Sequence, residues 1–346
     1  MTTRRLLDFA AALPKAELHV HHVGSAPPRV VAALAASYPA AGVPSDVDAL
    51  QDYFTFTDFA HFIEVYLTVV DLLRTPEDVR LLTYEVARDM AEQQIRYAEL
   101  TCTPYTSVVR GIAAEAYCEA IEDARVAAGR DFGVELSWCF DIPGELGLPA
   151  AEETLRIATT LRPEGLVSFG LGGPELGVGR EQFAPYFDAA RAAGLHSAPH
   201  AGETGGPDTV WEAVRHLGAE RIGHGIAAIE DPELVRHLAE HDVALELCPT
   251  SNVATGAVAS LDAHPMRALR EAGVPVTVNS DDPSMFGTTL TNEYVVAAGL
   301  LSLDEAGVVT LAQAAVNASF ATPQVKRRLL LEIAAALPAE RAAGSP

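Results

Sequence analysis

Two helix-to-strand transitions follow one another late in the chain, and their pattern decides the fold. DPELVRHLAEH at residues 231–241 is followed by VALELCPTSN at residues 243–252, and HPMRALREAG at residues 264–273 by VPVTVNSDDP at residues 274–283. The first segment of each pair is read as a helix, and the second begins as an almost unbroken apolar run. Apolar runs that are separated by helices are typical of parallel strands covered on both faces.

The same unit recurs along most of the chain. The other apolar runs are AELHVH, RYAELTCTP, VELSWCF, GLVSFGLGG, LHSAPHAGE and RIGHG, and each one after the first is preceded by a helical segment. Together these eight units predict an α/β fold of the closed (β/α)₈ TIM-barrel type. The main alternative is an open, doubly wound sheet. The first run is followed by HHVGS, however, and this is not the glycine-rich phosphate turn usual in that fold.

The segments outside these units set the expected domain boundaries. Residues 1–13 are expected to form a helical lead-in, residues 14–337 a single barrel domain, and residues 338–346 a disordered tail. A helical insertion is expected after the first strand, at residues 44–73, and further helices follow the last strand. The insertion contains DYFTFTDFAHFIEVYL, the densest group of aromatic residues in the chain, which could pack on the core or cover a pocket as a lid.

Composition argues against several classes of partner. The 346 residues include 47 acidic and 24 basic side chains, a formal net charge of -23, and the basic residues form no cluster. Such a charge repels phosphate backbones and anionic lipid, so neither nucleic acid nor a membrane is expected as a partner. The four cysteines form no CxxC pair, and we recognise no signal peptide and no run of about 18 apolar residues. A cytoplasmic location is therefore expected, while the oligomeric state stays open.

Side chains that can bind a metal stand where the apolar runs end. In ELHVH, His19 and His21 are two residues apart, so the strand period directs both imidazoles to one face. His200 ends another run, and Asp281 follows the last one. The carboxyl ends of parallel strands meet at one end of a barrel, so these four side chains are expected around one ion. Three imidazoles and a carboxylate favour Zn²⁺, one per chain, with Fe²⁺, Co²⁺ or Mn²⁺ as alternatives.

The residues beside these ligands indicate a hydrolytic reaction. The four ligands would leave one coordination position for water. Binding to the metal there would lower the pKa of that water from about 15.7 towards about 7. Glu203, three residues after the ligand His200, is the expected general acid, and His224 would orient the nucleophile. Asp281 could also accept a proton from the water, which leaves Asp282 free to bind substrate.

Five motifs, PKAELHVH, HAGE, RIGHG, CPTSN and NSDDP, together resemble the adenosine and adenine deaminases of the amidohydrolase superfamily. The motifs occur in that family's order, and the likeness extends from about residue 14 to residue 320. The resemblance implies a (β/α)₈ barrel with zinc on His19, His21, His200 and Asp281. The H-x-E and P-C-x-x-C signatures of the deaminases that act on nucleic acid are absent.

The resemblance also implies a role for each residue around the substrate, a small purine nucleoside. Glu203 would protonate the purine N1, and His224 would lie beside the attacking hydroxide. Asp282 would bond to N7, and the backbone of Gly173 would lie near N3. Hydroxide would add at C6, and ammonia would leave.

Two departures from the family pattern bear on the substrate. Adenosine deaminases hold the ribose 5′-hydroxyl with an Asp at the position where this chain has Val23, in HHVGS. Loss of such an acceptor removes a preference of roughly 10⁴ for the free hydroxyl, so a bulky apolar 5′ group is expected. The second departure is Gly170, in FGLGGPE, where the adenosine enzymes usually have Asp. Both departures resemble the deaminases of 6-amino-6-deoxyfutalosine, a nucleoside of menaquinone biosynthesis with a benzoate-bearing 5′ extension.

Further binding residues are expected for that substrate. Phe54 and Phe59 of the aromatic insertion would pack on the extension, and Arg29 or Arg180 would meet its carboxylate at the pocket mouth. Three alternatives stay open. They are a deaminase of adenosine or 5′-methylthioadenosine, a metal-dependent hydrolase of an ester or lactone, and a non-catalytic purine-binding protein on a deaminase scaffold.

Overall fold

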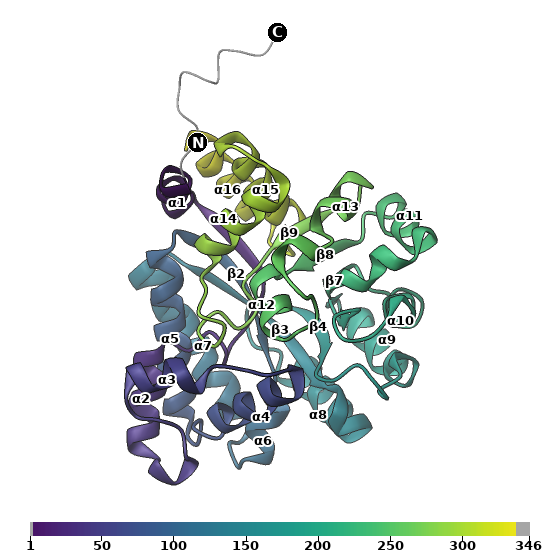
Figure 1. Cartoon of the computed structure of the whole chain (residues 1–346). Helices are drawn as coiled ribbons and strands as arrows, with labels where there is room; N and C mark the ends of the chain where they lie inside the picture. The colour runs from purple at the N-terminus through teal and green to yellow at the C-terminus, as the bar shows by residue number, and fades with distance from the viewer. Residues whose placement is uncertain (1–2, 337–346) are drawn as a thin grey trace.

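Strands from the whole length of the chain form one barrel. The computed structural model describes residues 3–336, and Figure 1 shows its strands at the centre with helices around them. Every pairing between these strands is parallel. In chain order the strands are β1 (Lys15–His21), β2 (Ile95–Cys102), β3 (Glu135–Pro143), β4 (Leu166–Gly172), β5 (His196–Ser197), β6 (His200–Ala201), β7 (Arg221–His224), β8 (Ala244–Leu247) and β9 (Val276–Val278).

The strands close on themselves. β5 and β6 are two parts of the fifth barrel strand, interrupted at Pro199, which has no N–H to donate. The carbonyl of Pro199 still accepts the N–H of Gly223 in β7, at 3.0 Å. At the other seam a bridge pairs Val20 of β1 with Asp281, just after β9, and the N–H of His21 donates to the Asp281 carbonyl at 2.8 Å. The expected (β/α)₈ barrel is confirmed.

Helices alternate with the strands and cover the barrel. In α11 the Asp231 side chain caps the N-terminus by accepting the N–H groups of Glu233 and Leu234, and Pro232 occupies the first turn. Leu234 and Leu238 then share a buried face. The covering helices are α5 (Pro76–Glu92), α7 (Ala114–Phe132), α8 (Gly147–Arg156, continued by a π-helical turn over Ile157–Leu161), α9 (Ala184–Ala192), α10 (Pro207–Leu217), α11 (Pro232–Glu240) and α13 (Met266–Glu271).

The connection between β1 and α5 is helical, as expected. It contains α2 (Pro28–Ser37), α3 (Val47–Tyr53) and α4 (Phe59–Val70), with Asp46 and Asp58 capping the last two. Two short helices, α6 (Pro104–Val109) and α12 (Pro249–Ala254), begin directly after β2 and β8. They therefore lie at the carboxyl end of the barrel.

The last helices return to the first one. Figure 1 shows α14 (Leu290–Leu301), α15 (Glu305–Ala318) and α16 (Pro323–Ala335) on the same side of the barrel as α1 (Thr3–Ala12). Arg5 of α1 and Glu305 of α15 form an ion pair at 2.7 Å. The assignment of residues 14–337 to a single domain stays a prediction, and the expected tail at 338–346 lies outside the described residues.

Within residues 3–336 no single helix is long and apolar enough to cross a membrane. The bent pair of α14 and α15 meets the length and composition of a span only when its two halves, 118° apart, are taken together.

Candidate active site

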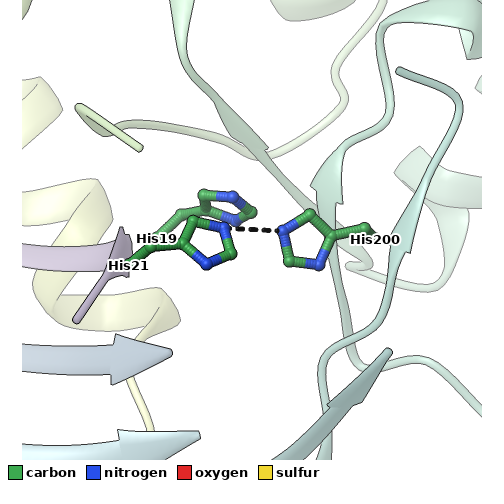
Figure 2. Close-up of side chains that lie close together, drawn as sticks. All are labelled: His19, His21 and His200. Carbon is green, nitrogen blue, oxygen red and sulfur yellow. Dashed lines mark hydrogen bonds between the residues drawn. The ribbon is translucent and has the colours of Figure 1, made fainter. Parts of the chain in front are cut away.

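Four side chains from three parts of the chain converge at the carboxyl end of the barrel. Figure 2 shows His19 and His21 of β1 facing His200 of β6, with 3.1 Å between the Nε2 atoms of His21 and His200. Asp281 completes the group, with its Oδ1 3.2 Å from His21 Nε2. The Nε2 atom of His19 is buried 3.4 Å from the same oxygen and has no hydrogen-bond partner. Three imidazoles, one with an unpartnered nitrogen, and a carboxylate fit a divalent metal ion of the zinc type.

The protonation of this cluster also suits a metal. Burial, followed by the nearby histidines, lowers the pKa of His200 well below its usual value, so its Nε2 lone pair is free to bind. Burial alone would raise the pKa of Asp281, but the imidazoles of His19 and His21 beside it hold it well below its usual value. His200 and Asp281 are therefore in the forms that bind a metal, neutral imidazole and ionised carboxylate. Burial lowers the pKa of His19, but the carboxylates of Asp281 and Glu246 raise it to about 10, so a metal ion would have to displace its proton.

A second layer of buried side chains fixes the ligand His19. Its Nδ1 lies 2.8 Å from Glu246 Oε2, and the other oxygen of Glu246 accepts a hydrogen bond from Arg221 Nε at 2.6 Å. Arg221 also pairs with Glu99, at 2.5 Å. Such partners set the orientation and basicity of a metal-binding imidazole.

The second layer also contacts His200 and Asp281. It adds residues to the site that was predicted from the sequence. His200 Nδ1 lies 3.1 Å from the Leu171 carbonyl, and the Ser251 hydroxyl donates to Asp281 Oδ2 at 2.6 Å. Sequence reasoning missed this layer. Its one signal was charge within apolar strand runs, at Glu246 in VALEL and Arg221 in RIGHG.

Glu203 is a carboxyl group that holds its proton. Burial, together with the negative charges of Asp281 and Glu175, raises the pKa of Glu203 well above its usual value. Its Oε1 accepts a hydrogen bond from the Thr255 hydroxyl at 3.3 Å. Glu203 lines the same cavity as His21, His200 and Asp281. A proton donor and the His/Asp cluster therefore face the same space.

The buried carboxylate of Glu175 accepts hydrogen bonds from the loop that carries Glu203. This carboxylate accepts the N–H groups of Gly202 and Glu203, each at 2.7 Å, and the N–H of Thr204 at 3.0 Å. Glu175 is 4 % exposed, and Arg180 lies 3.6 Å from its Oε2. One buried carboxylate therefore accepts three successive backbone N–H groups, from Gly202 to Thr204.

Two adjacent cavity residues have unusual backbone conformations. His224 and Asp281 have φ angles of +59° and +65°, in the left-handed region that few non-glycine residues adopt. Strain of this kind persists where the surrounding structure enforces it, and it clusters at functional sites.

Asp282 is buried and close to Gly24, where a Cβ would meet its Oδ1 at 1.6 Å. Burial and the neighbouring Asp281 raise the pKa of Asp282 well above its usual value. Its Oδ1 has no hydrogen-bond partner in the described chain. Asp282 can therefore donate a proton to a hydrogen-bond acceptor of the substrate.

One face of α4 forms the apolar wall of the cavity. The residues at the wall repeat with helical spacing and are Phe59, Phe62, Ile63, Tyr66 and Leu67. The cavity also reaches Thr103, Thr106, Pro143, Glu145, Gly172 and Gly173. Its free volume is about 90 Å³. Pockets for drug-sized ligands hold about 300–1,000 Å³, so part of this wall must move to admit one.

Asp141, a cavity residue that sequence reasoning missed, fills the space left by Gly170. A Cβ at Gly170 would lie 2.5 Å from Asp141 Oδ1, an atom without a hydrogen-bond partner. Burial raises the pKa of Asp141 well above its usual value. A usable signal existed, because Asp141 ends the apolar run VELSWCF in the same way as the expected ligands end theirs.

The expected substrate residues divide into two groups. Asp282, Gly173 and Phe59 line the cavity. Val23 is buried but does not line it, and Phe54 lines a separate hollow beside Phe286.

The expectation that Arg29 or Arg180 reaches the pocket mouth needs correction. Arg29 pairs on the surface with Asp89 and Glu85 of α5, at 2.5 and 3.1 Å. Arg180 is 2 % exposed and donates to the Val178 and His200 carbonyls, at 2.8 and 3.2 Å. Both guanidinium groups are thus already paired outside the cavity. The physical reason is local: α5 presents two carboxylates to Arg29, and backbone carbonyls lie within hydrogen-bond distance of Arg180.

Comparison with known proteins agrees with this geometry. The pattern of the family described as Adenosine deaminase matches residues 14–336. An aminodeoxyfutalosine deaminase from Streptomyces avermitilis is 65% identical over 334 residues, covering 96% of this chain and 93% of the relative.

Two solved structures extend the comparison to the fold. An adenine deaminase from Arthrobacter aurescens superimposes with a TM-score of 0.87 at 31% identity, covering 93% of this chain and 98% of that one. An amidohydrolase from Burkholderia ambifaria with bound zinc has a TM-score of 0.86 at 25% identity, covering 97% and 94%. The chain is thus a metal-dependent aminohydrolase and belongs to the adenosine deaminase family of the amidohydrolase superfamily.

Proposed function

We propose that this protein hydrolyses 6-amino-6-deoxyfutalosine to futalosine and ammonia, in the route to menaquinone. The reaction class rests on one observation: Glu203, a carboxyl group whose pKa is raised by burial, shares a cavity with the His/Asp cluster. The substrate rests on the identity to the Streptomyces avermitilis enzyme over nearly the whole chain.

The metal ion proposed for the cluster is zinc, one per chain, held by His19, His21, His200 and Asp281. When bound, such an ion makes a water molecule nucleophilic at neutral pH. The zinc in the Burkholderia ambifaria relative supports this choice over iron, cobalt or manganese.

The residues of the chain then have separate tasks. Glu203 gives its proton to N1 of the purine, which makes C6 electrophilic. Asp282, also protonated, donates a hydrogen bond to N7, and the backbone of Gly173 lies near N3. Water oxygen adds at C6, the exocyclic nitrogen takes up a proton and leaves as ammonia, and a C6 carbonyl remains. His224 hydrogen-bonds to the attacking oxygen, and Asp281 can accept a proton from it.

The apolar face of α4 is proposed to contact the 5′ extension. Phe59, Ile63 and Leu67 lie on this face, and Leu67 is 37 % exposed at the rim. No Lys or Arg lines the cavity within residues 3–336, so the benzoate carboxylate is placed at the mouth, in water. We infer that α4 acts as a lid, because the cavity is too small for a nucleoside until this wall moves.

A cytoplasmic location completes the proposal. All four cysteines are buried and unpaired, which suits a reducing compartment.

A substrate panel tests the proposal. The purified, zinc-loaded protein is mixed with aminodeoxyfutalosine, adenosine, 5′-methylthioadenosine and adenine, and ultraviolet absorbance and ammonia are followed. We expect the highest kcat/KM for aminodeoxyfutalosine. A clear preference for adenosine would overturn the substrate assignment. A metal-loaded protein that binds these purines but releases no ammonia would instead be a binding protein.

A further inference from the structure

Two buried side chains, His264 and Asn252, link a backbone N–H to the ring of His224. The N–H of Met266 donates to His264 Nδ1 at 3.1 Å, and His264 Nε2 lies 3.2 Å from Asn252 Oδ1. At the other end of the amide, Asn252 Nδ2 lies 3.0 Å from His224 Nδ1. Asn252 and His264 are buried and do not line the cavity, whereas His224 does. The chain of hydrogen bonds therefore reaches the reaction space only through His224.

The direction of each hydrogen bond follows from the first. A backbone N–H can only donate, so His264 Nδ1 accepts and carries no proton. The proton of this neutral imidazole is then on Nε2, which donates to Asn252 and requires the amide oxygen at that end. The amide nitrogen can only donate, so it faces His224 Nδ1, and that nitrogen must accept. Burial lowers the pKa of His264 to about 4, in agreement with a neutral ring at pH 7.

We propose that Asn252 and His264 are positioning residues that keep the proton of His224 on Nε2, the nitrogen that faces the cavity. His224 Nε2 lies 3.6 Å from Glu203 Oε2 and 3.9 Å from Asp281 Oδ2, between the proton donor and the metal cluster. A neutral imidazole with its proton at this place donates a hydrogen bond to the attacking oxygen and cannot accept its proton. The inference rests on the proposed deamination and makes His224 a hydrogen-bond donor rather than a general base. The proton lost by the nucleophile must then go to a carboxylate of the cluster.

The tautomer of His224 can be measured independently of activity. The zinc-loaded protein is labelled with ¹⁵N-histidine, and long-range ¹H–¹⁵N spectra are recorded, with the His224 signals assigned by their loss in His224→Gln. We expect a pyridine-like Nδ1 and a pyrrole-like Nε2. A proton on Nδ1 of His224 in the wild-type protein would overturn the proposal, whichever substrate the enzyme deaminates.

His22 provides an internal reference for these spectra. Its Nε2 lies 2.7 Å from Thr83 Oγ1, whose own proton is donated to the Val79 carbonyl. His22 is therefore also protonated on Nε2, and its signals should not change in variants of Asn252 or His264.

Asn252→Asp tests the inner link of the chain. A carboxylate of the same size cannot donate to His224 Nδ1, so the proton of His224 should move to Nδ1. We expect this change in the spectra and a fall in kcat of roughly 10²-fold, as when one donor to a reacting oxygen is removed. The zinc content should be unchanged.

His264→Gln and His264→Leu form a matched pair at the outer link. Glutamine keeps an N–H donor for Asn252 Oδ1 and should keep the wild-type tautomer and a kcat close to wild type. Leucine removes this donor, so the amide can turn over, and a mixture of His224 tautomers with a lower kcat is expected. Equal losses of kcat in the two variants, or an unchanged tautomer in both His264→Leu and Asn252→Asp, would overturn the proposal. The wild-type spectrum and this pair keep the test decisive if Asn252→Asp does not fold.

Discussion

A carboxyl group that keeps its proton at neutral pH is the residue on which the proposed reaction depends. Glu203→Gln keeps the shape of the side chain but removes the acidic proton. We expect kcat to fall roughly 10²- to 10⁴-fold, the usual contribution of a general acid. The metal content should stay at one ion per chain, because Glu203 is not among the four ligands. Steady-state kinetics and elemental analysis of the same sample check both points.

A matched control for Glu203→Gln lies elsewhere on the cavity wall. Glu145 is an exposed residue whose carboxyl group is partly desolvated, which raises its pKa above the usual value, and the cavity reaches this carboxyl as well. Glu145→Gln should therefore change KM more than kcat. A Glu203→Gln variant with wild-type kcat would remove the general acid from the mechanism.

His22 shows how a histidine next to two ligands can serve stability instead of catalysis. Burial lowers the pKa of His22 to about 4, compared with about 6.5 in an unfolded chain. Between these values the unfolded state binds more protons, so the free energy of unfolding decreases as pH falls from 6.5 to 4. The pKa difference corresponds to roughly 3 kcal/mol at the acidic end of this range.

His22→Gln keeps an N–H donor for Thr83 and removes this proton uptake. Urea unfolding of wild type and variant at about pH 7 and about pH 4.5 should show that wild type loses more stability on acidification than the variant. His241→Gln, at an exposed position, is the control and should follow wild type. Parallel pH dependence of wild type and His22→Gln would show that His22 is not held neutral by the fold.

At the residue scale, motif spacing predicted the residues that face the metal cluster but not those behind them. Two rules, the alternation of side chains along a strand and the meeting of strand ends in a barrel, predicted that His19, His21, His200 and Asp281 lie close together. Both rules depend only on backbone geometry. Glu246 and Arg221 lie on neighbouring strands, and their pairing depends on register, which no local pattern encodes. The arginines expected at the pocket lie elsewhere, because Arg29 pairs with carboxylates of α5 and Arg180 donates to nearby backbone carbonyls.

At the scale of elements, the loop after β6 is positioned by a carboxylate from the loop after β4. Glu175→Gln replaces an acceptor oxygen with an NH₂ group that would face backbone donors. Leaving buried N–H groups unsatisfied costs about 1–3 kcal/mol, so the melting temperature should drop. Because Glu203 is carried by this loop, kcat should drop as well, while KM changes little. Glu181→Gln, on an exposed site of the following turn, is the matched control.

Separate measurements of kcat and of the melting temperature of Glu175→Gln show whether Glu175 positions Glu203 or only stabilises the loop. If kcat measured well below the melting temperature equals that of wild type, Glu175 stabilises the loop without setting the position of Glu203. A loss of kcat with intact metal content supports the positioning role.

Most helices and strands could be predicted because their apolar patterns are regular. DPELVRHLAEH forms α11 as expected, and the structure shows that Asp231 caps it. The fifth barrel strand is the exception, since Pro199 divides it into β5 and β6, and ladder hydrogen bonds to its neighbours hold the two parts in line. The sequence left open whether the aromatic insertion packs on the core or covers a pocket, and the structure places one face of α4 at the cavity. Its aromatic residues predicted burial, but only the packed structure shows which of them face the site.

For the whole molecule, the proposed metal ligands join the first, fifth and last strands of the barrel. His19 and His21 come from β1, His200 from β6, and Asp281 follows β9, where the barrel closes. A ligand that binds only the folded state stabilises it by roughly 3–4 kcal/mol at 100 to 1,000 times its Kd. Removal of the metal with a chelator should therefore lower the melting temperature by several degrees, and added zinc should restore it.

His21→Ala separates the effect of the metal from that of the chelator. This variant lacks one ligand, so its melting temperature should lie near that of the metal-free wild type and respond weakly to chelator and zinc. His241→Ala, an exposed control, should respond like wild type. Differential scanning fluorimetry with elemental analysis measures both quantities. Because the proposed ligands span the closing seam between β9 and β1, metal-free protein should also exchange the amide hydrogens of β1 and of the segment after β9 faster than those of β3, which is separated from β1 by β2. Equal exchange at the seam and in β3 would show that the ion adds stability without helping to close the barrel.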